Sequence, residues 1–339
     1  MKYFSMFSGI GGFELGIQSA YGMGGTSRTS DTEDRRDLSV PTPSDGNGRR
    51  AYPDCIGYSE IDKYAVQIYQ KHFGNNPVRS IQSQNTEESK NSQCSTNKLE
   101  QRKHLDNYKG HKNYGNARNI IWEEVPNFDL LVGGFPCQAF SIAGKRGGFE
   151  DTRGTLFFEI ARALSVKRPQ LCLLENVRGL LSHDKGKTFG TILTTLSGLG
   201  YFLEWQVLNS KDFGVPQNRE RVFIVGHLRG TSRPEVFPIG ETTSGSIQVS
   251  KRGKHQQDIV YKEAGIMAAL PCGTHASTPH LTKTELNDMR IRRLTPTECE
   301  RLQGFPDGWT EGVSDTQRYK CLGNAVTVNV IQAIMEKLL

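Results

Sequence analysis

The sequence predicts an α/β fold with a mostly parallel sheet whose two faces are covered by helices. Five short apolar runs, bounded by turn-forming residues, are typical of buried strands: residues 3–7, 129–132, 171–174, 202–208 and 222–225. Between them, apolar residues recur at helical spacing, first at Leu156, Ile160 and Leu164 and then at Phe189, Leu193 and Leu196. Strands that alternate with helices indicate a parallel sheet packed between helical layers.

Two stretches interrupt this alternation. Residues 22–53 and 75–110 are rich in Ser, Thr, Asn, Gln, Gly and charged residues and contain hardly any aliphatic ones. Such a composition cannot bury enough apolar surface to offset the entropy of the chain. We therefore expect both stretches to be surface insertions, largely disordered, in a catalytic and cofactor-binding domain that spans residues 1–229.

The rest of the chain divides into two further parts. Residues 230–290 have few long apolar runs and several Lys and Arg residues, so we expect a second, small domain there. Residues 295–298 read Thr-Pro-Thr-Glu, a capping box with Pro at the first helical position, and this helix should end at Gly304. Residues 327–338 predict a last helix with Val330, Ile334 and Leu338 on one face. Residues 291–339 should thus return to the first domain.

Composition limits the class of protein. The chain has 339 residues, a formal net charge of +6 and a pI near 8.9, which permits a polyanionic partner without requiring one. The start of the chain does not resemble a secretory signal, and no stretch is apolar enough to span a bilayer, so we expect a cytoplasmic protein. The seven Cys form no CxxC pair, which gives no indication of a disulfide framework or a zinc site.

The first motif joins the predicted strand at residues 3–7 to a helix through Ser-Gly-Ile-Gly-Gly at residues 8–12. Glycines at such a turn let the backbone approach a ligand at a helix N-terminus, although a tight connection is an equally good interpretation of the turn by itself. Glu60 follows another apolar run, residues 56–59, where an acidic residue would bind ribose hydroxyls. The usual spacing of about 20 residues is restored when the first insertion is left out.

The second motif, Gly-Gly-Phe-Pro-Cys-Gln at residues 133–138, begins where a predicted strand ends. A free Cys is usually a small buried hydrophobe, and for Cys137 alone that is the better interpretation. However, a Cys at the mouth of a sheet, followed by Gln138 and Ser141, is placed like a nucleophile that can be activated as a thiolate.

Two more motifs place charged side chains at strand ends. Glu175 and Asn176 follow the apolar run 171–174; either could be a helix cap, but a partly desolvated Glu175 could also hold a proton near neutrality. Arg219 and Arg221 precede the last predicted strand and point to the same side of an extended chain. Two guanidinium groups on one face suit a phosphate or a carbonyl oxygen, and an exposed ion-paired strand is the alternative.

In this order, the blocks FSGIGG, GGFPCQAFS, ENV, QNRER, RRLTPTECERLQGFP and GNAV resemble those of the C5-cytosine DNA methyltransferase family, in its bacterial and phage form. The resemblance covers nearly the whole chain outside the insertions and residues 230–290. It implies a class I S-adenosylmethionine-dependent methyltransferase fold, which is Rossmann-like, with residues 230–290 as a target-recognition domain.

The resemblance also implies catalytic roles. Cys137 is the nucleophile that adds to carbon 6 of a cytosine, and Glu175 contacts ring nitrogen N3. Arg219 and Arg221 hold the base oxygen and a neighbouring phosphate. The target base is extruded from the duplex into the pocket, and Gln138 and Ser141 bind DNA near the vacated position.

The cofactor implied is S-adenosyl-L-methionine, at the positions Phe7, Ile10, Gly12, Glu60, Ile61, Asn116, Pro136, Leu156, Asn324, Ala325 and Val326. One position departs from the family, which often has Asp where this chain has Asn116, beside the adenine amino group. An amide carbonyl can still accept that hydrogen bond, but without a charge.

The expected partner is double-stranded DNA, methylated by a monomer that needs neither a metal nor a membrane. The biological setting would be a restriction-modification system or a solitary phage or host enzyme. A tRNA cytosine-5 methyltransferase and a non-catalytic DNA-binding relative are the alternatives.

Overall fold

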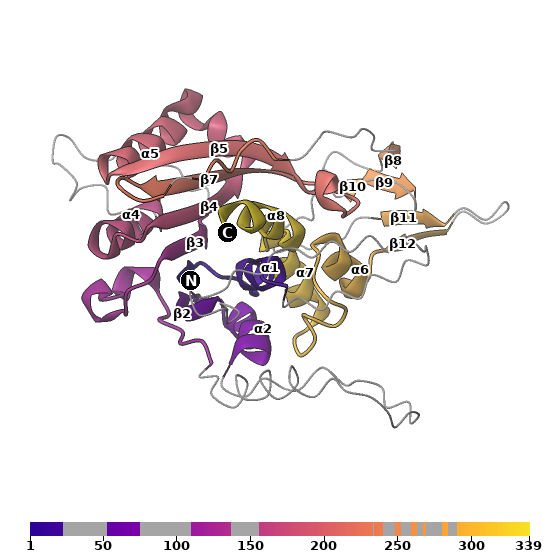
Figure 1. Cartoon of the computed structure of the whole chain (residues 1–339). Helices are drawn as coiled ribbons and strands as arrows, with labels where there is room; N and C mark the ends of the chain where they lie inside the picture. Colours follow the sequence, from indigo (N-terminus) through magenta and orange to yellow (C-terminus); the bar gives the residue numbers. More distant parts are fainter. Residues whose placement is uncertain are drawn as a thin grey trace, which may run out of the picture.

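The computed structural model describes residues 1–22, 53–74, 110–136, 156–232, 234–239 and 293–339 in full, together with the backbone of five short strands between residues 248 and 293. Six strands form the central sheet in the order β2-β1-β3-β4-β7-β5 (Figure 1). Their bounds are β1 Lys2–Met6, β2 Asp54–Ser59, β3 Leu130–Gly134, β4 Leu171–Val177, β5 Tyr201–Asn209 and β7 Glu220–Leu228.

The sheet is mixed. Strands β2, β1, β3 and β4 run parallel to their neighbours, which confirms the expected parallel core. Strand β7 lies antiparallel between β4 and β5. A short connection joins β5 to β7, through the single turn η5 (Ser210–Phe213) and the two-residue strand β6 (Gln217–Asn218). A parallel pair would need a crossover of about a dozen residues or more, so the short connection gives an antiparallel pair.

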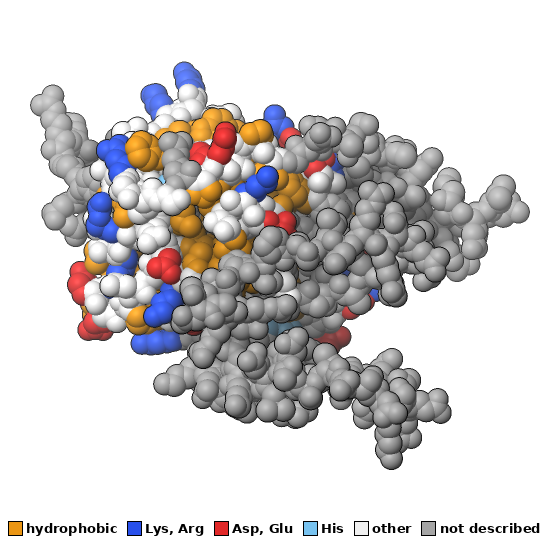
Figure 2. Space-filling view, viewed as in Figure 1, with side chains coloured by type: hydrophobic (Ala, Val, Ile, Leu, Met, Phe, Trp, Pro, Cys, Tyr) orange, Lys and Arg blue, Asp and Glu red, His pale blue; other side chains and the backbone are white. Residues whose placement is uncertain are grey.

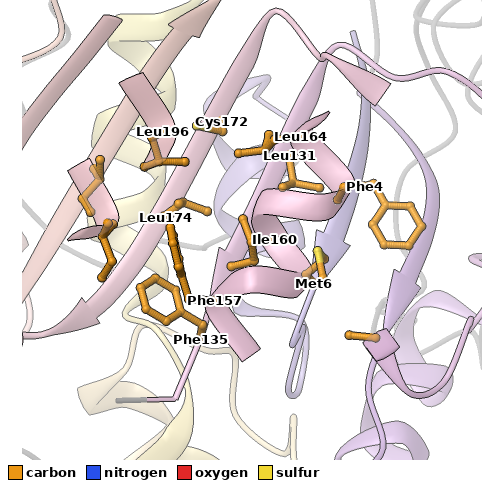
Figure 3. Close-up of a cluster of buried hydrophobic side chains, with 14 of the residues drawn as sticks. Phe4, Met6, Leu131, Phe135, Phe157, Ile160, Leu164, Cys172, Leu174 and Leu196 are labelled. Atoms are coloured by element: carbon orange, nitrogen blue, oxygen red, sulfur yellow. The ribbon is translucent and has the colours of Figure 1, made fainter. Parts of the chain in front are cut away.

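Helices cover both faces of the sheet, because strand residues alternate between the two faces. One face carries Phe4, Leu131 and Leu174 and is packed by α4 (Leu156–Lys167) and α5 (Lys187–Gly198). Figure 3 shows part of this cluster, with the α4 residues Phe157, Ile160 and Leu164 beside the strand side chains. The predicted helical spacings at residues 156–164 and 189–196 are thus confirmed.

The opposite face carries Tyr3, Leu130 and Leu173 and is packed by α1 (Gly12–Ala20) and α8 (Val328–Leu338). Val330 and Ile334 of α8 share this cluster with Phe13 and Ile17 of α1. The last helix therefore returns to the first strand and helix, as the sequence predicts.

A third cluster joins α2 (Lys63–Phe73), α6 (Pro296–Leu302) and α7 (Asp315–Asn324). The capping box at the start of α6 is confirmed: Thr295 accepts from the Glu298 amide, and the Glu298 carboxylate accepts from the Thr295 amide. Gly304, at φ +77°, follows the end of this helix. These contacts hold the C-terminal part of the chain against the first domain.

Residues 248–293 contribute a separate four-stranded sheet, in the order β12-β11-β9-β8 (Figure 1, orange). Its strands are β8 Gln248–Lys251, β9 Ile259–Lys262, β11 His280–Lys283 and β12 Arg290–Arg293, and the short β10 (Met267–Ala268) pairs with β6. Just before this sheet, Val236 and Phe237 are buried in the second cluster, and their amides donate to Glu204 on β5. The chain is therefore still attached to the central sheet at this point, a few residues inside the predicted small domain.

Apart from residues 22, 53 and 110, the expected insertions 22–53 and 75–110 lie outside the described residues. Within the described part, no helix is long and apolar enough to cross a membrane, and no three His, Cys, Asp or Glu side chains gather as a metal site would require. On the face shown in Figure 2, basic and acidic side chains are interspersed on the described surface, so the positive net charge does not form a single patch there.

Candidate active site

A cavity of about 510 Å³ opens at the carboxyl ends of β1, β3 and β4, where parallel α/β sheets bind their ligands. Strand β1 lies between β2 and β3, so the strands that follow it are added on opposite sides of β1, and the cavity lies beside this switch in the strand order. Its walls are formed by Phe7, Gly9, Ser59, Glu60, Ile61, Asn116, Ala117, Gly134, Phe135, Pro136, Leu156, Glu175, Asn176, Val177, Arg219, Arg221, Gly323 and Asn324.

The structure brings ten of the expected site residues to this one cavity: Phe7, Glu60, Ile61, Asn116, Pro136, Leu156, Glu175, Arg219, Arg221 and Asn324. Four others, Ile10, Gly12, Ala325 and Val326, are buried behind the wall rather than on it. Cys137, Gln138 and Ser141 lie outside the described residues, directly after the cavity residue Pro136.

The glycine-rich turn presents its backbone to Glu60. Gly9 has φ +56°, and a side chain there would meet nothing within 4 Å, so its backbone faces open space. Its amide donates to Glu60 Oε2 at 2.9 Å. The other oxygen, Oε1, accepts from the amides of Ile61 at 2.8 Å and Asp62 at 2.9 Å. Three backbone amides therefore fix the orientation of this carboxylate at the rim of the cavity.

The groups around Glu60 suit a nucleoside. The Ile61 side chain is 72% exposed, an unusual state for a large aliphatic residue, and it borders the cavity where a flat base could cover it. A carboxylate beside it can accept hydrogen bonds from ribose hydroxyls. Asn116 lies on the same wall, and its Oδ1 accepts from the Arg118 amide at 3.1 Å, which leaves a second lone pair on that oxygen.

Glu175, on β4, is only 9% exposed. Burial raises the pKa of its carboxyl group above the ordinary value, and the neighbouring Arg221 and Arg219 oppose that rise. Arg221 Nε lies 3.0 Å from Glu175 Oε1. The other oxygen, Oε2, would lie 2.9 Å from a β-carbon at Gly134, so a glycine is required to keep this oxygen clear. The predicted desolvation of Glu175 is confirmed.

Asn176 ties the strand that carries Glu175 to the segment that leads to Cys137. Its side chain is buried, with Nδ2 donating to the Phe135 carbonyl at 2.8 Å and Oδ1 accepting from the Val177 amide at 2.8 Å. Strand β3 pairs with β4 so that Gly134 lies opposite Glu175. The sequence predicts that Asn176 lies beside the Cys137 loop if strand order follows the sequence, with a helix cap as the alternative, but it gives no signal for the bond to Phe135, which depends on the register of the two strands.

The two arginines differ in their partners. Arg221 pairs with Glu175, whereas Arg219 is 2% exposed and donates from Nη2 to the carbonyls of Gly323 at 3.1 Å and Ala325 at 2.8 Å. Both line the cavity, as their shared side of the chain predicts. Arg219 also anchors the C-terminal segment that carries Asn324, a contact between distant parts of the chain that the sequence pattern did not indicate.

Comparisons with known proteins agree with this arrangement. A sequence model of the family described as C-5 cytosine-specific DNA methylase matches residues 100–264 and 239–339. The Type II methyltransferase M.NlaX of Neisseria lactamica is 34% identical, over 99% of this chain and 96% of the relative. M.HpaII of Haemophilus parainfluenzae is also 34% identical, over 99% of this chain and 88% of the relative.

Solved structures show the same fold. A mutant of DNMT2 from Spodoptera frugiperda aligns with a TM-score of 0.64 over 99% of both chains, at 16% identity. Dnmt2 methyltransferase of S. pombe aligns with a TM-score of 0.63 over 100% of this chain and 98% of that one, at 18% identity. Identities this low support the likeness of fold and nothing finer.

Proposed function

The chain belongs to the C-5 cytosine-specific DNA methylase family and is a DNA (cytosine-5) methyltransferase, and on that basis we propose how it acts. It transfers a methyl group from S-adenosyl-L-methionine to carbon 5 of a cytosine in a specific duplex DNA sequence. Cys137 is the nucleophile, and Glu175 activates the base. Type II relatives favour a role in restriction-modification.

One observation carries this proposal: the buried carboxylate of Glu175 and the chain segment that leads to Cys137 face one cavity. Pro136 lines the cavity, and Asn176 holds the Phe135 carbonyl at 2.8 Å. Cys137 is the next residue in the chain after Pro136. The proposed chemistry requires a nucleophile beside a proton donor, and Glu175 lines the cavity to which the chain before Cys137 leads.

Carbon 5 of cytosine is a poor nucleophile, so the ring must be activated before it can accept a methyl group. Addition of the Cys137 thiolate to carbon 6 breaks the conjugation of the ring. Glu175, whose pKa is raised by burial, donates to ring nitrogen N3 and stabilises the charge that the addition creates. Arg221 holds that carboxyl group in place and contributes positive charge beside the base oxygen.

The cofactor, when bound, supplies an electrophilic methyl group to carbon 5. After the transfer, the carbon 5 proton is lost to a base, and the electron pair of that bond reforms the ring double bond as the Cys137 thiolate leaves. The proton on N3 returns to Glu175. We assign the ribose hydroxyls to Glu60, one face of the adenine to Ile61 and the adenine amino group to Asn116. The open backbone at Gly9 and the exposed Ile61 fit a nucleoside at this position.

Access to carbon 5 requires extrusion of the target base, at a cost of a few kcal/mol, because that atom is buried in the base stack. We propose that Gln138 and Ser141 contact DNA at the vacated position. Residues 230–290, which contain the second sheet up to the first residue of β12, would choose the target sequence, with residues 1–229 and 291–339 as the catalytic part. The enzyme would act as a monomer.

Mapping of 5-methylcytosine tests this function. The chain is expressed in cells without cytosine methylation, and DNA is sequenced for modified positions, with purified tRNA and duplex DNA assayed side by side. We expect one short DNA sequence to be methylated throughout. Methylation of tRNA alone would support the RNA-modifying alternative, and no modification of either substrate would support a non-catalytic relative.

A further inference from the structure

Thr327 occupies the N-cap of α8, yet its side chain does not cap the helix. Threonine at an N-cap ordinarily accepts a hydrogen bond from a backbone amide of the first turn, which stabilises the helix. Here the hydroxyl is turned inward, where it donates to Gln303 Oε1 at 2.9 Å and lies 2.8 Å from Ser210 Oγ. The conformation gives up a local capping bond for contacts with two distant parts of the chain.

These contacts belong to a closed circuit of buried polar groups. Gln303 Nε2 donates to the Leu322 carbonyl at 3.1 Å. At the other end, the amide and the hydroxyl of Ser210 both lie within hydrogen-bond distance of the Arg219 carbonyl, at 3.1 and 3.3 Å. Arg219 closes the circuit through its bonds to the Gly323 and Ala325 carbonyls. Gln303, Thr327, Ser210 and Arg219 are each no more than 3% exposed.

The direction of the hydrogen bonds is fixed at one end. A carbonyl can only accept, so the nitrogen of the Gln303 amide must face Leu322 and its oxygen must face Thr327. Thr327 donates its single hydroxyl proton to Gln303, so the proton of the Ser210 hydroxyl can go either to Thr327 Oγ1 or to the Arg219 carbonyl. When Ser210 donates to Thr327, the Ser210 amide still bonds to the Arg219 carbonyl, and the bonds from Ser210 through Thr327 and Gln303 to Leu322 run in one direction, which strengthens each of them through polarisation.

The circuit holds residues 322–327 in place between the proposed cofactor side and the proposed base side of the cavity. Residues 322–327 carry Asn324, a wall residue assigned to the cofactor, and are held at Leu322, Gly323, Ala325 and Thr327. Arg219 holds two of these four residues through their carbonyls. It also lines the cavity, and it lies two residues before Arg221, which pairs with Glu175. The position of the cofactor side is therefore fixed relative to the base side by buried hydrogen bonds, and three of the residues that make them, Thr327, Gln303 and Ser210, do not line the cavity.

We propose that Thr327, Gln303 and Ser210 are positioning residues that set the distance between the bound methyl donor and the target base. This inference rests on the proposed function, because it takes the cavity to hold both ligands. Loss of one hydroxyl leaves the oxygen of Gln303 buried without its donor, and the segment 322–327 shifts to compensate. A shift of a fraction of an ångström lowers the methyl-transfer rate because the reacting atoms must lie in a narrow range.

The test compares Thr327→Val, which keeps the shape of the side chain and removes its hydroxyl, with Thr327→Ser, which keeps the hydroxyl. Calorimetry measures the Kd for S-adenosylmethionine, and rapid quench measures single-turnover methylation of a DNA duplex that holds the mapped target. We expect Thr327→Val to weaken cofactor binding about tenfold and to slow methyl transfer by a similar factor. Affinity for duplex DNA should change less than about twofold, because phosphate contacts dominate it. Thr327→Ser should restore most of both losses.

Thr310→Val is the matched control. Thr310 is as buried as Thr327 and belongs to the same C-terminal part, but its hydroxyl bonds to Glu300 and Arg318, outside the circuit. This variant should lose thermal stability and keep wild-type cofactor affinity and rate. Ser210→Ala should act in the same direction as Thr327→Val, and the two changes combined should be clearly less than additive.

Wild-type cofactor affinity and rate in folded Thr327→Val would overturn the inference while the proposed function stood. Equal losses in Thr310→Val would also overturn it, because they would show a general effect of destabilisation. If the unaltered enzyme binds cofactor but methylates no DNA, the proposed function fails, and cofactor affinity alone still decides whether the circuit positions residues 322–327.

Discussion

Glu175 in the cavity and Glu300 in the C-terminal loop are both buried glutamates, but their surroundings differ in one respect. Glu300 is 0% exposed and accepts from the Gly308 amide at 2.7 Å, the Thr310 amide at 2.8 Å, the Thr310 hydroxyl and Arg318 Nη2 at 3.1 Å. Glu175 forms an ion pair with Arg221, Arg219 lies nearby, and burial raises the pKa of the Glu175 carboxyl group. The Glu300 carboxylate is enclosed by the protein, whereas the Glu175 carboxylate lines the cavity.

This difference in surroundings indicates a structural role for Glu300 and a chemical role for Glu175. Donors around Glu300 come from the loop and helix that follow it, so this fully buried carboxylate shapes residues 308–318 and is not accessible to a ligand. Glu175 faces the cavity with its Oε2 beside Gly134, where a base could supply the missing partner. A buried group whose hydrogen bonds are incomplete and whose pKa is perturbed is what a proton-transferring site requires.

The same substitution at each site should give opposite results. Glu175→Gln keeps the shape of the side chain but cannot donate a carboxyl proton to N3, so methyl transfer should slow by about 100-fold or more. Thermal stability should stay the same or rise, because a desolvated carboxyl is removed. Single-turnover kinetics and a thermal melt measure the two quantities. A rate within about threefold of wild type would show that Glu175 does not activate the base.

Glu300→Gln should instead cost about 3 to 5 kcal/mol of unfolding free energy, because Arg318 and two amides lose a charged acceptor in a buried site. Activity per folded molecule should stay close to that of wild type. Urea unfolding gives the first number and active-site titration the second. An unchanged stability would mean that the donors around Glu300 are satisfied without its charge.

The sequence could predict interactions between residues that are close in the chain, but not those between residues that are far apart in it. The capping box at Thr295 and the apolar runs of the strands are local patterns, and both were predicted within a few residues. Glu175 was predicted because it ends an apolar strand. By contrast, Glu300 accepts from Thr310 and Arg318, and Arg219 donates to Ala325, more than 100 residues away. Residues that are brought together only by the tertiary fold produce no periodic pattern in the sequence from which their contact could be predicted.

The strand order shows the same limit. Alternation of strands and helices predicted a parallel sheet, and it holds for β2, β1, β3 and β4. Between β5 and β7 the sequence has no helical pattern, only the short stretch 210–219, and this absence was the available signal for an antiparallel pair. The Cys137 loop, the insertions and the domain limits lie wholly or partly outside the described residues, and they stay predictions.

Glu14 on α1 is a third buried carboxyl group. Like Glu300 it has a hydrogen-bond donor from the protein, and like Glu175 its pKa is raised by burial. It is 0% exposed, and its Oε1 accepts from the Tyr69 hydroxyl at 3.0 Å. Burial raises its pKa from 4.5 to about 7, and the hydrogen bonds only partly oppose this. The folded state therefore favours the protonated form of Glu14. The contribution of this group to the free energy of unfolding is fully present below pH 4.5 and is lost as the pH rises to about 7.

The loss should be on the order of 2–3 kcal/mol across that window. Urea unfolding of wild type and Glu14→Gln at pH 5 and pH 8 measures it, since the amide variant lacks the titration and cancels the contribution of all other groups. We expect the stability difference between the two proteins to change with pH in that direction. A difference that is constant from pH 5 to pH 8 would show that Glu14 is ionised throughout.

The smallest effect is expected at an exposed position. Asn116→Asp adds a carboxylate where solvent reaches the side chain, and both residues can cap the Arg118 amide. Cofactor affinity should hold or improve by at most about threefold, because a charged acceptor would meet the adenine amino group. Calorimetry with S-adenosylmethionine measures this. A large loss of affinity would move the adenine away from Asn116.

The central claim is that Cys137 attacks the ring of a flipped cytosine. Four other cysteines are described, and all are buried; burial raises the pKa of Cys172, Cys299 and Cys321 to about 12 and that of Cys55 further. These four thiols are therefore poor competitors for the role of nucleophile.

Duplex DNA with 5-fluorocytosine at the mapped target tests the claim most directly, because fluorine at carbon 5 cannot leave as a proton does, and the thiol stays attached. With S-adenosylmethionine present, we expect a denaturant-resistant adduct between protein and DNA whose modified peptide contains Cys137. Cys137→Ser should form none, since a hydroxyl is a far weaker nucleophile at neutral pH. An adduct at any other cysteine, or equal trapping by the Ser variant, would contradict the mechanism.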